Sequence, residues 1–486
     1  MAVDFGRYQS PGVYSESIPG PLLSVQSATP MAVGIFGQTV GFRTDSEAVR
    51  IPVDLVSEEG GDPEPTRTAN LRQPGVKKET IRVTHPMSGR EYIEGTDYTV
   101  ETPSGEEGGR ESVYAIKRLP EGHLLEGDDV QVSYSYTNNE YFEPRQFFDY
   151  SDVQEAYGSP FDPNGNIQSE LSLAARLAFQ NGAQRVVGVA IDPEDPSAPA
   201  LSDYEDALQK LEGNLDVSII VPATGMRQIQ DTVTAHVRTQ SNGGYERRAV
   251  VGRDGSQTPV PPQQLIIDAE TIRERRVMLV GPASLQFFAS ELNQNVSLGG
   301  QFLAAAVAGR AAALIPAEPL TRKPINGFQG ATKEESDGQK NLMAQSGVAI
   351  VEKARNSAFR IRHGVTTDPS TVLTREWSII GQQDRMIQQM KAYLDADGLV
   401  GTMINDLTLV NIKASADAAL QSLTRDMTIR DYRDLRVRQL EANPDVVEVV
   451  FEWRASLPLN YIVIRFALNT STGSVAGGDS VEQATL

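Results

Sequence analysis

The middle of the chain alternates amphipathic helical segments with short apolar runs, and this alternation limits the possible fold more than any other feature. Residues 167–180 carry apolar side chains at helical spacing and lead into the apolar run 185–191. Further apolar runs follow at 217–221, 249–251 and 277–280, each after a connecting segment. Repeated helix and strand order is typical of a largely parallel sheet that is covered by helices.

Three further helices are predicted. Ser202 and Glu205 form a capping box that opens a helix ending at Leu211. Residues 301–314 form an alanine-rich helix, whose small side chains allow close packing, and residues 375–394 form a strongly patterned one. The apolar stripe of this last helix is interpreted as core filling and consists of Trp377, Ile380, Met386, Ile387 and Met390.

Residues 51–140 differ in character from the segments on either side. Turns rich in glycine, proline and acidic residues separate short alternating segments at 80–84, 98–101, 112–118 and 130–136. This pattern predicts a small all-β domain that is inserted into the chain and presented on a surface.

The C-terminal region returns to strands. Leu435 and Val437 alternate with arginines, residues 442–445 offer a turn, and residues 446–453 place Val447, Val449, Phe451 and Trp453 opposite Glu448 and Glu452. Residues 459–468 are apolar on both faces, with Ile462, Ile464, Phe466 and Leu468 opposite Tyr461 and Val463. A strand with this pattern needs cover on both sides.

The first 30 residues contain prolines and glycines and show no helical period, which indicates an extended arm. Such an arm is expected either to lie against a neighbouring sheet edge or to form a strand in its own domain.

With 486 residues, the chain is expected to form two or three domains. The fold class predicted is a mixed α/β and β multidomain protein with a mostly parallel, helix-covered core and extended arms at both ends. The predicted parts are an N-terminal arm (1–30), a first strand and linker of the core (31–50), the inserted β domain (51–140), the α/β core (141–365), a C-terminal α+β domain with a terminal strand (366–472) and a flexible tail (473–486).

A search for catalytic or ligand-binding motifs finds none. The chain has no cysteine, and His85, His123, His236 and His363 have no partner at metal-ligand spacing. The strand exits contain neither a phosphate-binding glycine motif nor a nucleophile elbow, and acidic runs such as 192–195 are typical of solvated loops. We therefore expect no catalytic, cofactor or metal site and no enzymatic activity.

The charge and hydropathy limit the possible partners. A formal net charge of −20 argues against direct nucleic-acid binding, because phosphates require clustered Lys and Arg. No stretch approaches 18 apolar residues and the N-terminus lacks the order of a secretory signal, so we expect no membrane insertion and assembly in the cytosol.

Several segments resemble the sheath proteins of contractile phage tails and related injection systems. The opening YQSPGVYSESIPG is similar to their PGVY opening, and NGAQRVVGVAI, DVSIIVP, GGQFLAAAVAGR and the run from VTTDPSTVLTREW to PLNYIVIRFAL match further segments. The resemblance covers both ends and most of the middle, whereas residues 51–136 depart from the minimal sheath and look like a variable insertion.

The resemblance implies a structural subunit of a virion tail that stacks as a helical homo-oligomer of rings around a tail tube protein and contracts to drive the tube through the host envelope. Baseplate and tail terminator proteins would be further partners. It also implies that both arms pair with sheets of neighbouring subunits. The residues assigned to this strand exchange are Tyr8, Pro11, Gly12, Val13, Tyr14, Ile18, Leu22, Val25, Tyr461, Ile462, Val463, Ile464, Phe466 and Leu468. Arg375 and Arg385, on one predicted helix, are candidate contacts to an acidic tube.

Two alternatives remain open from the sequence. One is a baseplate or other structural component of the same machine. The other is a soluble α/β hydrolase that acts through dispersed Asp and Ser residues, which would require a concave site with convergent titratable groups.

Overall fold

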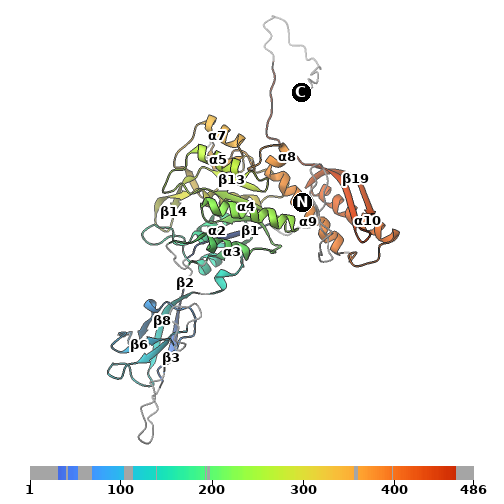
Figure 1. Cartoon of the computed structure of the whole chain (residues 1–486). Helices are drawn as coiled ribbons and strands as arrows, with labels where there is room; N and C mark the ends of the chain where they lie inside the picture. Colours follow the sequence, from blue (N-terminus) through green and yellow to red (C-terminus); the bar gives the residue numbers. More distant parts are fainter. Residues whose placement is uncertain are drawn as a thin grey trace.

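The computed structural model describes residues 31–39, 42–52, 68–102, 113–137, 139–191, 193, 198–354, 359–396 and 398–466. The predicted N-terminal arm, including all of its exchange residues from Tyr8 to Val25, and the predicted exchange residue Leu468 lie outside these residues. The described chain forms an α/β core, a β domain that projects from one end of the core, and a smaller domain beside it (Figure 1).

The core is built on an eight-stranded sheet, which confirms the prediction of a largely parallel, helix-covered sheet. Its strands, in spatial order, are β18 (Phe359–Ile361), β17 (Val348–Lys353), β13 (Val277–Gly281), β12 (Arg248–Gly252), β11 (Val217–Pro222), β1 (Ala32–Gly37), β10 (Val186–Ala190) and β9 (Arg145–Phe147). The six inner strands pair in parallel, and the two edge strands β9 and β18 are antiparallel to their neighbours. The inner strands are apolar along most of their length because helices cover both faces of the sheet.

Each face of the sheet has its own hydrophobic core. One core joins the sheet to α1 (Tyr150–Tyr157), α2 (Glu170–Gln180), α6 (Gly300–Ala312) and a small antiparallel sheet of β14 (Ser284–Ala289), β15 (Gln294–Gly299) and β16 (Phe328–Ala331). The other joins it to α3 (Leu201–Gln209), α4 (Arg227–Asn242), α5 (Pro262–Ile272) and α7 (Asp337–Gln345). Along β1, Ile35 belongs to the first core and Phe36 to the second, as the alternation of side chains in a strand requires.

The alanine-rich helix α6 packs closely, as its composition predicts. A Cβ atom placed on Gly309 would lie 2.2 Å from the carbonyl oxygen of Ala178 in α2. The two helix backbones are therefore in contact, and a larger residue at position 309 would separate them.

Several helix boundaries differ from the sequence prediction for local reasons. Helix α2 begins at Glu170 rather than at residue 167, because the Ser169 side chain accepts a hydrogen bond from the Ser172 N–H. The predicted capping box of Ser202 and Glu205 is wrong: α3 begins one residue earlier, at Leu201, and the Asp203 carboxylate accepts from the Ala200 N–H at 2.7 Å.

The helix predicted at 375–394 is two helices, α8 (Val372–Arg375) and α9 (Trp377–Ala396). Glu376 separates them with an extended backbone (φ −84°, ψ 114°). Its carboxylate is 1% exposed and binds three polar side chains, which fixes the turn between the helices.

Among its described residues, the projecting domain is β apart from one short 3-10 helix, η1 (Lys78–Thr80). A second 3-10 helix, η2 (Asn139–Phe142), packs against the α/β core through Tyr141 and Phe142. One sheet of the projecting domain contains β2 (Phe42–Arg50), β8 (Asp129–Thr137), β4 (Arg82–Thr84) and β5 (Glu91–Tyr92), and the other contains β3 (Ala69–Asn70), β7 (Ala115–Arg118) and β6 (Tyr98–Glu101). Strand β2 pairs with β8 along its whole length, from Phe42 with Thr137 to Arg50 with Asp129. The insertion therefore begins at residue 42, and the prediction that residues 42–50 belong to the core is wrong.

The third part contains α9, α10 (Asp406–Arg425) and a hairpin of β19 (Ile429–Gln439) and β20 (Val447–Ala455). Met386, Met390, Leu420, Leu423 and Phe451 lie at the centre of its core. Helix α9 is shared between two cores, because Trp377 at its start belongs to the α/β core. The predicted face of β20 is confirmed for Val449, Phe451 and Trp453, which pack toward the helices.

We predict that the α/β core folds without the projecting domain. Phe42 and Thr137 are directly paired, so a short Gly-Ser linker would join the ends left by deleting residues 42–137. The deletion variant is expected to be soluble and to keep its main thermal transition within about 5 °C of the full chain, because the domain has a core of its own. Loss of this transition in circular dichroism would contradict the prediction.

Candidate assembly surface

The chain leaves β20 and then runs along the surface as an exposed apolar segment. Exposure of its large apolar side chains ranges from 65% at Leu457 to 89% at Phe466. The exposed members are Leu457, Leu459, Tyr461, Ile462, Val463, Ile464 and Phe466. Residues 456–466 form no strand with the described part of the chain, so the described part of the strand predicted at 459–468 has no partner strand there. A contiguous exposed apolar segment is typical of a surface that binds a partner.

The hairpin of β19 and β20 is a two-stranded sheet, so neither outer edge is paired with another described strand. Helices α9 and α10 cover one of its faces, and Tyr432 of β19 donates to Asp417 of α10 at 2.6 Å. The other face carries cross-strand ion pairs, with Arg433 2.5 Å from Glu452 and Arg438 2.6 Å from Glu448. An isolated two-stranded sheet with two open edges is ready to accept further strands.

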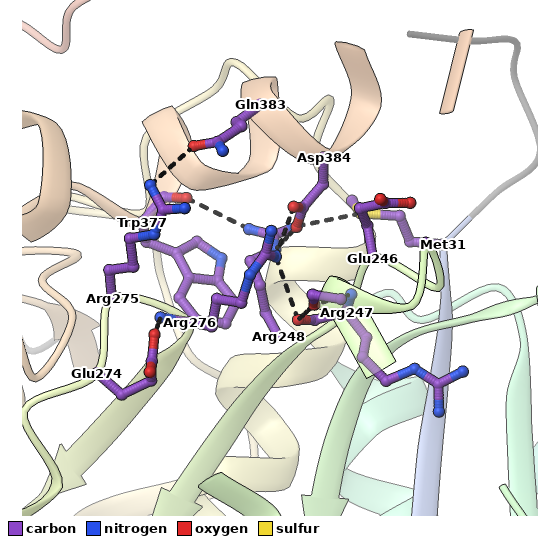
Figure 2. Close-up of polar contacts among 12 residues, drawn as sticks. Met31, Glu246, Arg247, Arg248, Glu274, Arg275, Arg276, Trp377, Gln383 and Asp384 are labelled. Carbon is purple, nitrogen blue, oxygen red and sulfur yellow. Dashed lines mark hydrogen bonds and ion pairs between the residues drawn. The ribbon is translucent and has the colours of Figure 1, made fainter. Parts of the chain in front are cut away.

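A buried charge cluster joins this domain to the α/β core. Asp384 of α9 lies 2.6 Å from Arg276 and 3.3 Å from Arg248, and all three side chains are less than 10% exposed (Figure 2). Arg248 and Arg276 come from the starts of neighbouring core strands, β12 and β13. One carboxylate therefore neutralises two buried cations, and its removal would leave both without a counter-charge.

Trp377 completes this joint. The Arg248 guanidinium lies 4.4 Å from the centre of the Trp377 ring and donates to the Trp377 carbonyl at 3.3 Å. It also lies 3.5 Å from the sulfur of Met31, the residue that precedes β1 (Figure 2). Burial lowers the pKa of Arg248 to about 10 while Asp384 opposes this shift, so Arg248 remains charged at neutral pH.

Two further polar contacts extend the joint along α9. Lys391 lies 3.1 Å from Glu246 and donates to the Gly244 carbonyl at 2.8 Å. Burial raises the pKa of Glu246, and the Lys391 ammonium opposes this shift. Gln383 accepts from Arg275 at 3.2 Å (Figure 2). Together with the Asp384 pairs, these polar contacts attach about two and a half turns of α9 to the core.

Comparison with known proteins identifies the family. A family model described as "Phage tail sheath protein central domain" matches residues 199–367. A tail sheath protein of Mycobacterium phage Bxz1 is 40% identical over 98% of this chain and 98% of its own length. The chain belongs to the tail sheath proteins. It is a structural subunit of a contractile tail sheath, and the resemblance expected from the sequence is confirmed.

Solved sheath structures share the fold. The contracted helical sheath of the anti-feeding prophage superposes with a TM-score of 0.56 at 12% identity and covers 95% of this chain and 100% of its own. The contracted PVC sheath complex of an extracellular contractile injection system gives 0.52 at 13% identity and covers 96% and 99%.

The structure describes predicted exchange residues of the tail sheath subunit in its C-terminal segment, whereas those of the N-terminal arm lie outside the described residues. Five of these C-terminal residues are described, and each is more than 70% exposed: Tyr461, Ile462, Val463, Ile464 and Phe466. Their pairing with a neighbouring subunit stays a prediction.

The two predicted tube contacts lie on or beside a helix with little free surface. Arg375 lies 3.3 Å from the buried Glu376, and its side chain is 28% exposed. Burial lowers the pKa of Arg385, with Asp426 opposing this shift. Residues 377–394 are all buried or half-buried, so α9 has no exposed basic face, and tube contact by these arginines stays a prediction.

Sequence reasoning missed the buried polar face of α9. Gln382, Gln383, Asp384 and Gln389 are each at most 6% exposed, although helix patterning places such residues on the solvent side. The run of three polar residues between Gly381 and Arg385, within an otherwise apolar helix, was the available signal.

The described residues form no candidate metal site, and three histidines contact charged side chains instead. Among them, no group of three or more His, Cys, Asp or Glu side chains could hold a metal ion. His363 lies 2.9 Å from Glu376, His236 lies 3.0 Å from Arg247, and His123 lies 2.9 Å from Asp97. In the same part of the chain, the helices are too short or too polar to span a bilayer.

We predict that Asp384 dominates the stability of the joint. Asp384→Asn removes the shared counter-charge of two buried arginines and is expected to cost about 3 kcal/mol of unfolding free energy. The measurement is urea unfolding followed by tryptophan fluorescence, which reports on Trp377 in the joint and on Trp453, the other tryptophan of the chain.

Asp431→Asn is the matched control. Its ion pair with Arg454, at 3.3 Å, is 47% and 62% exposed, so a loss below about 1 kcal/mol is expected. Equal losses in the two variants would contradict the assignment of the joint to Asp384.

Proposed function

We propose that the subunit assembles by lending its terminal segment to the β19–β20 sheet of a neighbouring copy. The observation that carries the proposal is the juxtaposition, in one subunit, of an exposed apolar segment at residues 461–466 and a two-stranded sheet with two open edges. Because each copy offers both a strand and an edge, the contact is heterologous and repeats from copy to copy. Such a contact supports an open helical stack of rings.

The side chains of the segment suit this pairing. In an extended strand, Ile462, Ile464 and Phe466 share one face, and Tyr461, Val463 and Arg465 share the other. We infer that the fully apolar face lies over the layer of α9 and α10, while Arg465 joins the charged face with Arg433 and Glu452. Burying three large apolar side chains in this way would contribute roughly 5 to 9 kcal/mol, as an upper bound. Main-chain hydrogen bonds to the open edge would add to it.

The second open edge matches the second arm. The N-terminal arm supplies apolar residues without a helical period, including Val13, Tyr14, Ile18, Leu22 and Val25. Two open edges in each sheet and two arms in each chain allow every edge to be filled by a neighbour. The resulting sheet would have four strands from three subunits.

In this function the assembled sheath surrounds a tail tube in the virion tail and contracts to drive the tube through the host envelope. Links made of main-chain pairing persist while the subunit bodies rotate, if hinge residues absorb the change in dihedral angles. Pro19, Gly20 and Pro21 are the proposed hinge of the N-terminal arm. The energy would come from a packing difference between extended and contracted arrays, repeated over many copies, so the subunit needs neither a cofactor nor catalysis. Assembly in the host cytoplasm and contacts with baseplate and tail terminator proteins belong to the same proposal.

We predict that a chain ending at Leu457 folds but does not polymerise. The truncation removes the exchange strand, other exposed side chains and the half-buried Asn460, and leaves the hydrophobic cores intact. Negative-stain electron microscopy should find monomers under conditions in which the full chain forms tubes. A chain ending at Leu468 is the control and should form tubes, because it keeps the exchange strand. Normal tubes from the shorter chain would contradict the proposal.

Deletion of residues 1–27 is expected to give the same result from the other end. The variant keeps Met31 and its contact with Arg248, so its thermal transition should match that of the full chain. Tubes of normal length would show that the N-terminal arm is not an exchange strand.

A further inference from the structure

The connector between β20 and the exposed segment is attached at both of its ends. Residues 456–460 are bound at Ser456 by Gln382 of α9, and at Asn460 by Glu376 and Thr321. The side chains of residues 461–466 are exposed. The connector therefore has two fixed points no more than about 14 Å apart along the chain, and Pro458 between them further limits its conformations.

Gln382 binds the main chain of Ser456 through both atoms of its amide. Its Nε2 donates to the Ser456 carbonyl at 2.9 Å, and its Oε1 accepts from the Ser456 N–H at 2.8 Å. The Gln382 side chain is 0% exposed. This paired contact fixes the orientation of the Ser456 peptide groups as well as their position, much as a neighbouring strand would.

Asn460 is bound between α9 and the core. Its Nδ2 donates to Glu376 at 3.0 Å, and its Oδ1 accepts from Thr321 at 3.3 Å. Glu376 is 1% exposed and also lies 2.9 Å from His363 and 3.3 Å from Arg375, which hold its carboxylate in place. The last fixed point before the exposed segment is therefore built on a carboxylate that cannot easily move.

The same helix positions the exit of the other arm. Met31, which precedes β1, contacts Arg248. Arg248 is held by Asp384, two residues after Gln382 and about two turns after Glu376. Both arms thus leave a single rigid unit formed by the first turns of α9 and the core strands.

We propose that Gln382 and Glu376 are positioning residues that set the direction in which the C-terminal arm leaves the subunit. The proposal rests on strand exchange as the mode of assembly. An arm held in one direction presents its strand to the neighbour's edge at high effective concentration, whereas a free arm loses conformational entropy when it docks. Weakening the clamp should raise the concentration required for tube formation about tenfold or more.

The absence of cysteine from the chain makes the direction of the arm measurable. Val463→Cys on the arm and Lys413→Cys on the exposed side of α10 provide two sites for spin labels, and pulsed electron paramagnetic resonance then gives their distance distribution in the soluble subunit. In the chain that carries only these two cysteines, the distance distribution should be narrow. Gln382→Ala and, separately, Asn460→Ala should broaden it.

Two controls separate positioning from general stability. Gln389→Ala changes another buried glutamine of α9, which is 3% exposed and whose Oε1 has no hydrogen-bond partner among the described residues, and it should leave the distribution narrow. Asp431→Asn, which changes an exposed ion pair on β19, should also keep it narrow. Asn460 is half-buried on the surface, so its variant is expected to fold even if Gln382→Ala lowers the melting temperature.

Broad distributions in Gln382→Ala and Asn460→Ala, together with the tenfold rise in the concentration for tube formation, would support the proposal. Narrow distributions in both variants would overturn it, whatever their effect on stability. The distance measurement uses unassembled subunits, so it is independent of strand exchange. The two proposals can therefore fail separately. If the two variants broaden the distance distribution but the chain truncated after Leu457 still forms tubes, the positioning role of Gln382 stands and strand exchange is rejected.

Discussion

The constraint on which the rest of the structure depends is the pair of unpaired strand edges in the β19–β20 sheet of the C-terminal domain. Among the described residues, the two-stranded sheet has unpaired main-chain donors and acceptors on both edges, and the apolar segment that follows it is exposed. Neither defect is corrected within the described subunit. If copies exchange strands, the open edges become paired and the apolar segment becomes buried. The folded subunit is therefore suited to polymerisation.

Strand exchange places demands on the body from which the arms leave. If the arms carry the links between copies, the points where they leave must keep a fixed relation to the rest of the subunit. Helix α9 meets this demand because it belongs to two hydrophobic cores and is bound to the α/β core through Asp384, Gln383 and Lys391. Buried ion pairs contribute little net stability, but they tolerate few alternative geometries. A polar joint of this kind suits a contact whose geometry matters more than its strength.

The sequence predicted those features whose signal is local. Apolar runs bounded by turns located the inner strands of the core sheet, because burial on both faces leaves a continuous apolar run in each of them. The start of the insertion was missed because β2 is a charged edge strand whose partner residues in β8 lie 79 to 95 positions away. The capping box at Ser202 failed because α3 already begins at Leu201, where the Asp203 carboxylate accepts from the Ala200 N–H. The clamp by Gln382 joins residues 74 positions apart, and only the polar run 382–384 within an apolar helix indicated that something unusual occurs there.

The central claim, that the C-terminal segment of one copy pairs with the β19–β20 sheet of another, is tested most directly by cross-linking between two single-cysteine proteins. One carries Val463→Cys, and the other carries, in turn, a cysteine on the charged face of the sheet at Arg436 or Arg438 of β19 or at Glu448 or Val450 of β20. Because the natural chain lacks cysteine, any disulfide between the two proteins reports a contact between copies. The account predicts that oxidation of mixed tubes gives cross-linked dimers at one edge with a preference for particular positions, and that oxidation of dilute monomers gives none. Tubes that assemble normally and give no dimers at either edge would contradict it.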